Sequence, residues 1–191
     1  MCPADKEGEM KDLWEKMSEE VVFENGLFRV VHARYRLSPR KRESVFATLS
    51  TADWINVIPI TEEGRFVLIR QFRHGTEEIT VEIPGGSVER GEDPLEAARR
   101  ELEEETGYTG GKWELIGSVT PNPAIQDNRC YTFLARGVKR GGEKKEDDME
   151  FIEVFEARPD EVRKMLTDGT ISHALVLAAF VHYLLKGHTL D

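Results

Sequence analysis

Short apolar segments rich in β-branched and aromatic residues recur along most of the chain and are separated by turn residues. The first two, residues 21–23 and 27–35, flank Asn25-Gly26, a dipeptide that favours tight turns, so they predict a β-hairpin. Together, these segments and the later ones predict a largely antiparallel or mixed sheet. The later strands are expected at residues 44–49, 54–60, 66–72, 79–83, 113–119, 130–138 and 151–155.

One helix is marked at both ends by residues that favour helix termini. Asp93 is a good N-cap, Pro94 suits the first helical position, and Glu96 stands where a capping box places its second member. Gly107 supplies the stop, because glycine adopts the left-handed conformation that ends many helices. The sequence therefore predicts a helix that begins at Pro94 and ends before Gly107.

Two further helices are expected at residues 160–166 and 172–186, on either side of the Asp168-Gly169 turn. Strands mixed with a few helices indicate an α+β fold packed in layers. The charged residues 1–20 are expected to form a leader. Residues 21–191 are expected to form a single domain, because the sequence has no internal repeat and no sign of a second domain.

The composition is that of an ordinary globular protein, with 39% hydrophobic and 32% charged residues. The chain carries 36 aspartate and glutamate residues against 26 lysine and arginine residues, a formal charge of -10. Such a surface repels the phosphate backbone of nucleic acids, so no nucleic-acid partner is expected. A polyanionic small-molecule substrate would need a local basic patch or a bound metal.

Neither a membrane partner nor an oxidising compartment is indicated. The longest apolar run, residues 174–185, is interrupted by His182 and falls well short of the roughly 20 residues that cross a bilayer, so it predicts a buried terminal helix. Cys2 and Cys130 are too few for a disulfide framework, and the N-terminal residues are too charged for a signal peptide. A cytoplasmic protein is expected.

The strongest chemical signal runs from residue 82 to residue 108, where a Gly-Gly turn precedes a helix dense in carboxylates. Glu101 and Glu105 lie one turn apart on one helical face, beside the apolar stripe of that helix. Like charges so placed repel each other, and a hard divalent cation that prefers oxygen ligands would compensate them. The glycine turn lets backbone approach closely, so the Gly85 carbonyl is a further candidate ligand.

Arg100 and Glu92 complete this segment. Arg100 can tie Glu92, in the loop before the helix, to the helix by a bidentate ion pair, and Glu104 lies one turn beyond Arg100. A solvated acidic face is the ordinary alternative for a glutamate-rich helix. The spacing of the charged residues favours a functional site instead.

That spacing resembles the Nudix box, G-x5-E-x7-R-E-U-x-E-E-x-G-U, with U a bulky hydrophobic residue, and the chain is identified as a member of the Nudix hydrolase family. The resemblance implies an α/β/α sandwich with a mixed sheet and an N-terminal β extension. It also implies metal-dependent hydrolysis of a nucleoside diphosphate linked to another moiety, with Mg²⁺ as cofactor and Mn²⁺ as the alternative. The box is matched without departure by Gly86, Glu92, Arg100, Glu101, Leu102, Glu104, Glu105, Gly107 and Tyr108.

The resemblance also implies a role for each charged residue of the box. Glu101 and Glu105 resemble the principal metal ligands. Glu104 resembles the further acidic position that binds metal or assists catalysis. Arg100 and Glu92 resemble the pair that orients the others.

Segments outside the box resemble those of ADP-ribose pyrophosphatases and related nucleotide-sugar hydrolases. IRQFR at residues 69–73 and EIPGG at residues 82–86 precede the box in that manner, and Pro123 resembles the downstream proline of the ADP-ribose group. The stretch around Pro123 departs from the usual ADP-ribose loop, which leaves other nucleotide sugars open. The implied reaction yields a nucleoside monophosphate and a sugar phosphate. Alternatives are hydrolysis of nucleoside triphosphates or dinucleoside polyphosphates, and a sensor without catalysis.

Three charged residues of these two segments are candidates for substrate binding. Arg73 ends a strand, and its guanidinium would pair well with phosphate oxygens, an exposed strand-end charge being the alternative. Glu82 is assigned to the substrate site with its segment. Arg70 is a weaker candidate, with a structural ion pair as the alternative. Trp54 could stack on a base, although a tryptophan at a strand start is usually a core residue.

The late loop, residues 139–148, and the strand start after it hold further carboxylates. In ADP-ribose pyrophosphatases an acidic residue of this loop activates the attacking water and a nearby glutamate binds an additional metal. By resemblance these places belong to Asp148 and Glu150. Aspartate stands where glutamate is expected, so Glu146 and Glu143 are alternatives for the base, and a solvated loop is the alternative for the whole cluster.

The remaining expectations concern assembly and the C-terminal histidines. Residues 21–49 resemble the N-terminal extension through which ADP-ribose pyrophosphatases dimerise and build their substrate site, which implies a homodimer. His173 and His182 have no partner at metal-ligand spacing and are expected to be ordinary core or interface residues.

Overall fold

The computed structural model describes residues 10–145 and 151–191. The chain forms two compact units. The first unit comprises Met1–Ala52 and Asn122–Asn128, and the second comprises Asp53–Pro121 and Arg129–Asp191. The predicted α+β class is confirmed, because the described residues of the second unit form a mixed sheet and three α-helices.

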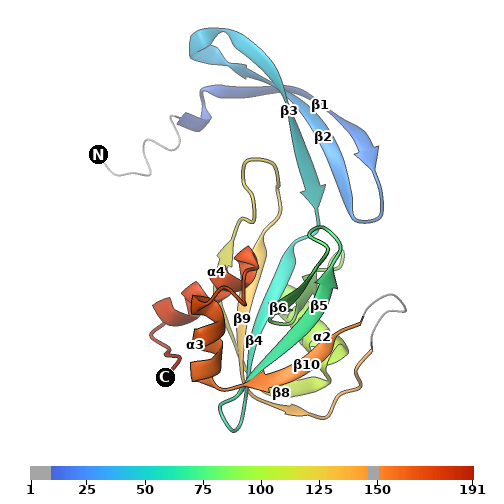
Figure 1. Cartoon of the computed structure of the whole chain (residues 1–191). Helices are drawn as coiled ribbons and strands as arrows, with labels where there is room; N and C mark the ends of the chain where they lie inside the picture. The colour runs from blue at the N-terminus through green and yellow to red at the C-terminus, as the bar shows by residue number, and fades with distance from the viewer. Residues whose placement is uncertain (1–9, 146–150) are drawn as a thin grey trace. The chain divides into compact units, whose positions relative to one another are not determined.

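The first unit is a three-stranded antiparallel sheet in the order β1-β2-β3 (Figure 1). The predicted hairpin is present, and the Asn25 side-chain oxygen accepts hydrogen bonds from the N–H groups of Leu27 and Phe28. Its elements are β1 (Trp14–Glu24), β2 (Phe28–Leu37), the 3₁₀ helix η1 (Ser38–Arg40) and β3 (Arg42–Thr51).

Strand β1 begins at Trp14, so residues 14–20, expected in the charged leader, form the first seven of the 11 residues of a strand. The backbone N–H and C=O groups of these residues pair with those of β2, and this pairing does not depend on the side chains. Their charged side chains remain exposed, and Glu15 forms an ion pair with Arg36 across the two strands. The predicted start of the extension therefore moves from residue 21 to residue 14.

The second unit is built on a seven-stranded mixed sheet with the order β10-β5-β4-β9-β8, in which β6 pairs with β5 and β7 with β4. β4 and β9 run parallel, and the other pairs are antiparallel. The strands are β4 (Trp54–Thr61), β5 (Phe66–Arg73), β6 (Glu78–Glu82), β7 (Gly85–Ser87), β8 (Tyr108–Val119), β9 (Cys130–Arg140) and β10 (Glu153–Ala157).

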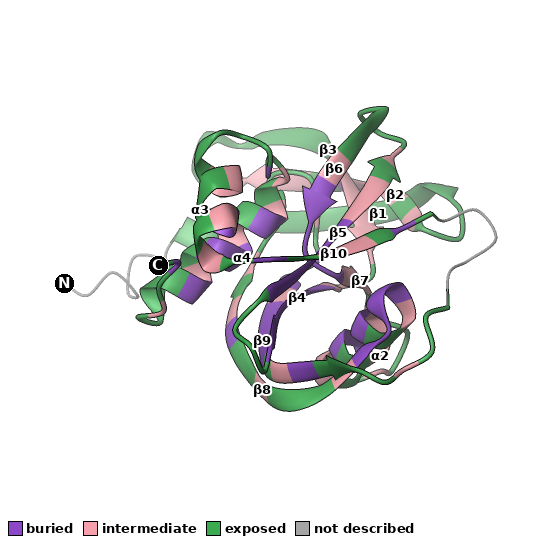
Figure 2. Cartoon of the chain, turned by 60° about the horizontal axis from the view of Figure 1, so that its bottom comes forward, coloured by how far each residue is buried: buried purple, intermediate pink, exposed green. Residues whose placement is uncertain are grey.

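Helix α2 (Pro94–Thr106) covers one face of this sheet, and α3 (Pro159–Thr167) and α4 (Ala174–Leu185) cover the other (Figure 2). Both predicted ends of α2 are confirmed. Asp93 accepts a hydrogen bond from the N–H of Leu95, and Gly107 ends the helix in the left-handed conformation. Glu96 does not complete the predicted capping box: its carboxylate pairs with Arg99 instead.

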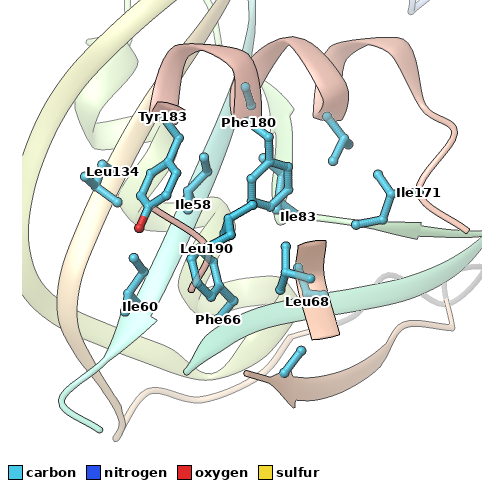
Figure 3. Packing of buried hydrophobic residues seen from close by; sticks show 14 of the residues in the cluster. Ile58, Ile60, Phe66, Leu68, Ile83, Leu134, Ile171, Phe180, Tyr183 and Leu190 are labelled. Carbon is cyan, nitrogen blue, oxygen red and sulfur yellow. The ribbon is translucent and has the colours of Figure 1, made fainter. Parts of the chain in front are cut away.

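Two apolar cores lie on the two faces because alternate side chains of a strand point in opposite directions. In β4, Ile58 and Ile60 belong to the core under α3 and α4, whereas Ile55 and Val57 pack under α2. Figure 3 shows Phe180 and Tyr183 of α4 pointing toward the strands, and the Phe180 ring centroid lies 6.1 Å from that of Phe66 of β5. In the described residues, no helix is long and apolar enough to span a bilayer.

Phe180 should contribute strongly to stability, because its side chain is only 1% exposed within this core. Truncation by Phe180→Ala removes buried apolar surface and leaves a cavity, so we expect the free energy of unfolding to fall by about 3–5 kcal/mol in urea denaturation. Leu185→Ala is the control on the same helix, because Leu185 is 78% exposed. Equal losses for the two variants would contradict this packing.

Candidate functional site

The backbone of Gly85 and Gly86 lies between strand β4 and helix α2. Strand pairing joins Gly85 to Asn56 and Gly86 to Ile55. A Cβ atom on Gly85 would lie 2.4 Å from the carbonyl oxygen of Ile55, and one on Gly86 would lie 2.3 Å from the carboxylate carbon of Glu101. Glycine at position 85 therefore permits the close approach to the strand backbone, and glycine at position 86 leaves space for the Glu101 carboxylate.

Two carboxylates of α2 face this glycine turn. Glu105 is buried, and its Oε2 accepts a hydrogen bond of 2.9 Å from the N–H of Gly85. The carboxylate of Glu101 lies against Gly86. The structure thus brings the two predicted metal ligands and the predicted carbonyl donor, Gly85, to one place.

Arg100 connects the loop before α2 to the carboxylates on the helix. Its Nε and Nη2 donate to the two carboxylate oxygens of Glu92 at 3.0 Å each, which is the predicted bidentate pair. Its Nη1 donates to Glu101 at 2.8 Å and to Glu104 at 3.1 Å, and its Nη2 also donates to the Ser87 carbonyl. The hydrogen bonds from Arg100 hold the pKa of Glu92 below its usual range, and these carboxylates raise the pKa of Arg100.

The donor set suits a hard divalent cation, because carboxylate and carbonyl oxygens are the ligands that such ions prefer. Among the residues that the structure describes, no three acidic, histidine or cysteine side chains converge as they would around an ion. Arg100 donates hydrogen bonds to Glu101 and Glu104, while Glu105 accepts a hydrogen bond from the N–H of Gly85 in the glycine turn. The predicted base Asp148 and ligand Glu150 lie outside the described residues.

Arg73 and Glu82 form an ion pair on the adjoining β5–β6 ribbon. Arg73 Nε and Nη2 donate to the two oxygens of Glu82 at 2.8 and 2.7 Å, and the Thr80 hydroxyl donates to Glu82 at 2.6 Å. Burial alone would raise the pKa of Glu82, which is 2% exposed, but these hydrogen bonds outweigh it and hold the pKa below its usual range. Because side chains alternate along a strand, Arg73, Thr80 and Glu82 lie on the same face of the β5–β6 ribbon as Val67, which packs under α2.

A cavity of about 1030 Å³ joins this ion pair to the glycine turn. Its lining includes Arg73, Glu82, Gly85 and Gly86, together with Trp54 at the start of β4. All these residues belong to the second unit. The carboxylates of Glu101 and Glu105 do not line the cavity themselves, but the glycine turn that they contact does. The position of the cavity therefore fits a substrate whose reacting centre lies at the turn.

Arg70 lines the same cavity but points from the opposite face of β5 to Arg73. Its Nη1 donates to Glu153 at 2.9 Å, and its guanidinium carbon lies 4.1 Å from the ring centroid of Phe155. The structural ion pair named as the alternative for Arg70 is therefore present.

His173, expected to be a core or interface residue, is a cavity residue. It is the N-cap of α4, and its Nδ1 atom lies 3.8 Å from Oε2 of Glu82. No spacing in the sequence could have linked His173 to Glu82, because only the packing of α4 on the sheet brings them together. His182 does have the expected packing role: its ring fills the space beside Gly117.

Comparison with known proteins identifies the family. Residues 52–180 match the NUDIX domain, and the chain belongs to the Nudix family. It is 33% identical over 179 residues to an ADP-ribose pyrophosphatase of Bacillus subtilis, covering 93% of this chain and 96% of that protein. It is 36% identical over 131 residues to a methanol dehydrogenase activator of Bacillus methanolicus, covering 68% of this chain and 70% of that protein.

The fold comparison agrees with the family. The crystal structure of an ADP compounds hydrolase superimposes with a TM-score of 0.80 at 22% identity, covering 91% of this chain and 95% of that one. This likeness confirms the predicted Nudix-type layered fold with a mixed sheet.

The buried Glu82 should make stability depend on pH in a defined direction. Its pKa in the folded protein lies below the ordinary value of 4.5, so its carboxylate contributes stability at higher pH that is lost as the pH falls through the folded pKa. Glu82→Gln abolishes that contribution. We therefore expect the free energy of unfolding of Glu82→Gln to fall less than that of the wild type between about pH 7 and about pH 3 in urea denaturation.

The control for this measurement is Glu78→Gln, which changes an exposed carboxylate on the same strand. It should follow the wild-type pH dependence. If the curves for wild type and Glu82→Gln run parallel over the whole range, the hydrogen-bonded state assigned to Glu82 is wrong.

Proposed function

We propose that this protein is a metal-dependent diphosphatase of nucleoside diphosphate sugars, with ADP-ribose or a related compound as substrate. The products are a nucleoside monophosphate and a sugar phosphate. The observation that carries the proposal is the convergence of Glu101, Glu105 and the Gly85–Gly86 turn beside a cavity that holds the Arg73–Glu82 pair. The alignment with an ADP-ribose pyrophosphatase over nearly the full length of both chains supports this substrate class.

The cofactor in this proposal is Mg²⁺, with Mn²⁺ as a substitute. Glu101, Glu105 and Glu104 would hold it with the Gly85 carbonyl, because all four supply oxygen ligands and the carboxylates of Glu101 and Glu105 lie at the glycine turn. A bound divalent cation supplies charge neutralisation of the diphosphate and polarisation of its phosphorus–oxygen bonds.

Arg100 and Glu92 act as positioning residues. The fork to Glu92 fixes the Arg100 side chain, and the remaining donors of Arg100 fix the carboxylates of Glu101 and Glu104. The acidic helix face is thus ordered before substrate arrives, which lowers the entropy cost of assembling the site.

Proton transfer from the attacking water falls to a carboxylate. By family resemblance Asp148 is the base and Glu150 a further metal ligand, with Glu104 assisting from the helix. Attack in line with the leaving oxygen at one phosphorus then breaks the diphosphate linkage. No covalent intermediate with the protein is required.

Substrate binding is assigned to the cavity. Glu82 holds the Arg73 guanidinium by two hydrogen bonds, and the partly exposed Arg73 side chain is thereby aimed to contact the diphosphate. Arg70 has a secondary part, because Glu153 and Phe155 already engage its guanidinium.

The same proposal includes a homodimer that acts in the cytoplasm on a small molecule, without a nucleic-acid or membrane partner. The formal charge of -10 supports the absence of a nucleic-acid partner. Large apolar side chains exposed on the first unit support association: Trp14, Met17, Val21, Val22, Phe23, Val45 and Phe46 are each 40–51% exposed.

The activity is tested with Mg²⁺ and a panel of ADP-ribose, GDP-mannose, UDP-glucose, ATP and a dinucleoside polyphosphate, with chromatographic identification of products. We expect cleavage of nucleotide sugars to monophosphates. Glu101→Gln and Glu105→Gln should each lower kcat on the order of 10²-fold or more, because each removes a charged ligand of the cation that neutralises the diphosphate.

Glu103→Gln is the matched control, since Glu103 is an exposed carboxylate on the same helix. Its kcat should equal that of the wild type. Turnover of ATP or the dinucleotide alone would replace the proposed substrate class, and metal-dependent binding without any turnover would indicate a sensor.

The dimer is tested by a double variant, Trp14→Glu with Phe46→Glu, which places two charges in an exposed aromatic cluster where the ring centroids are 6.1 Å apart. We expect sedimentation to show a dimer for the wild type and a monomer for the variant. Leu185→Glu, at an exposed position on α4, should remain dimeric. A wild-type monomer at micromolar concentration would contradict the proposal.

A further inference from the structure

His173 occupies an unusual position in the cavity wall. Its ring nitrogen Nδ1 is buried without a hydrogen-bond partner and lies 3.8 Å from Oε2 of Glu82. The side chain as a whole is nevertheless 35% exposed, and the residue lines the cavity. The ring therefore turns Nδ1 toward the buried carboxylate and leaves its other edge accessible.

The Glu82 carboxylate determines what that accessible edge can do. Both oxygens of Glu82 are negatively charged acceptors that already bind Arg73 and Thr80. A lone pair on Nδ1 facing this carboxylate would be repelled, whereas an N–H is attracted. In the neutral ring the hydrogen therefore sits on Nδ1, and Nε2 is left as a hydrogen-bond acceptor.

An acceptor in this cavity selects for a donor on the substrate. The oxygens of a diphosphate are acceptors only, whereas the hydroxyl groups of a sugar can donate. The position of His173 near the glycine turn fits a contact with a sugar hydroxyl. Asn56 pairs with Gly85, and its side chain donates a hydrogen bond to the carbonyl of Leu175, two residues beyond His173. The first turn of α4 is thereby fixed beside the place assigned to the diphosphate, and the sugars of the substrate adjoin its diphosphate.

We propose that His173 is a substrate-binding residue whose Nε2 accepts a hydrogen bond from a sugar hydroxyl, with Glu82 orienting the ring through Nδ1. This inference rests on the proposed function. It gives Glu82 a second role, because its carboxylate positions both Arg73 for the diphosphate and His173 for the sugar. The cavity would thus favour diphosphates that carry hydroxyl-bearing groups.

Three substitutions separate the two ring nitrogens. His173→Ala removes both, His173→Gln places an amide oxygen near the position of Nε2, and His173→Asn places its amide near the position of Nδ1. We expect His173→Ala to raise KM for ADP-ribose by about five- to tenfold with little change in kcat, as for the loss of one hydrogen bond between uncharged groups. His173→Gln should restore KM, and His173→Asn should not.

Product inhibition shows which sugar is bound. AMP carries the nucleoside ribose, and ribose 5-phosphate carries the sugar beyond the diphosphate. Weaker inhibition of His173→Ala by one of these compounds assigns the contact to that half and supports the proposal. Unchanged inhibition by both overturns it, as does an unchanged KM, restoration by Asn rather than Gln, or failure of Gln to restore KM.

Folding and the proposed function are controlled separately. His173 makes no capping hydrogen bond to α4, so its replacement removes no helix cap, and the thermal midpoint of each variant should match that of the wild type. If the wild type itself fails to cleave ADP-ribose with Mg²⁺, the proposed function fails. If the wild type is active and the variants show the wrong pattern, only the role of His173 fails.

Discussion

Between strand β4 and helix α2 the chain passes through a space with no room for a side chain. Gly85 and Gly86 fill it, and a Cβ atom at either position would meet backbone or carboxylate within 2.4 Å. Because the turn fits, the N–H of Gly85 reaches Glu105 and the Glu101 carboxylate reaches the turn. Helix, turn and strand are thereby fixed to one another, and the cavity wall continues from that junction.

The second constraint is the crowding of negative charge. Glu92, Glu101 and Glu104 surround one guanidinium, that of Arg100, in a chain that already carries a formal charge of -10. Hydrogen bonds from Arg100 order these carboxylates, and on the β5–β6 ribbon Arg73 does the same for the buried Glu82. Hydrogen bonds from the two arginines hold the pKa values of Glu92 and Glu82 below their usual range.

Much of the fold and the centre of the site follow from local sequence signals. Asp93, Pro94 and Gly107 define α2 because caps act within one turn of the helix. The spacing of the box also indicates the pairing of Arg100 with Glu92, because they lie only eight residues apart in the sequence. Strand β7 was not predicted, because a glycine pair has low strand propensity and only its pairing with β4 makes it a strand. The contact of His173 with Glu82 was also missed, since it joins residues distant in the sequence.

The parallel pairing of β4 with β9 has a consequence for how the protein folds. Residues 54–61 lie beside residues 130–138, and the intervening chain contains α2 and the four strands β5 to β8. Closing so long a loop costs entropy before its contacts can repay it, so this pairing is a slow step. During synthesis the acidic helix therefore emerges well before the strand that completes the sheet around it. Until β9 is made, α2 has only part of the surface on which it packs.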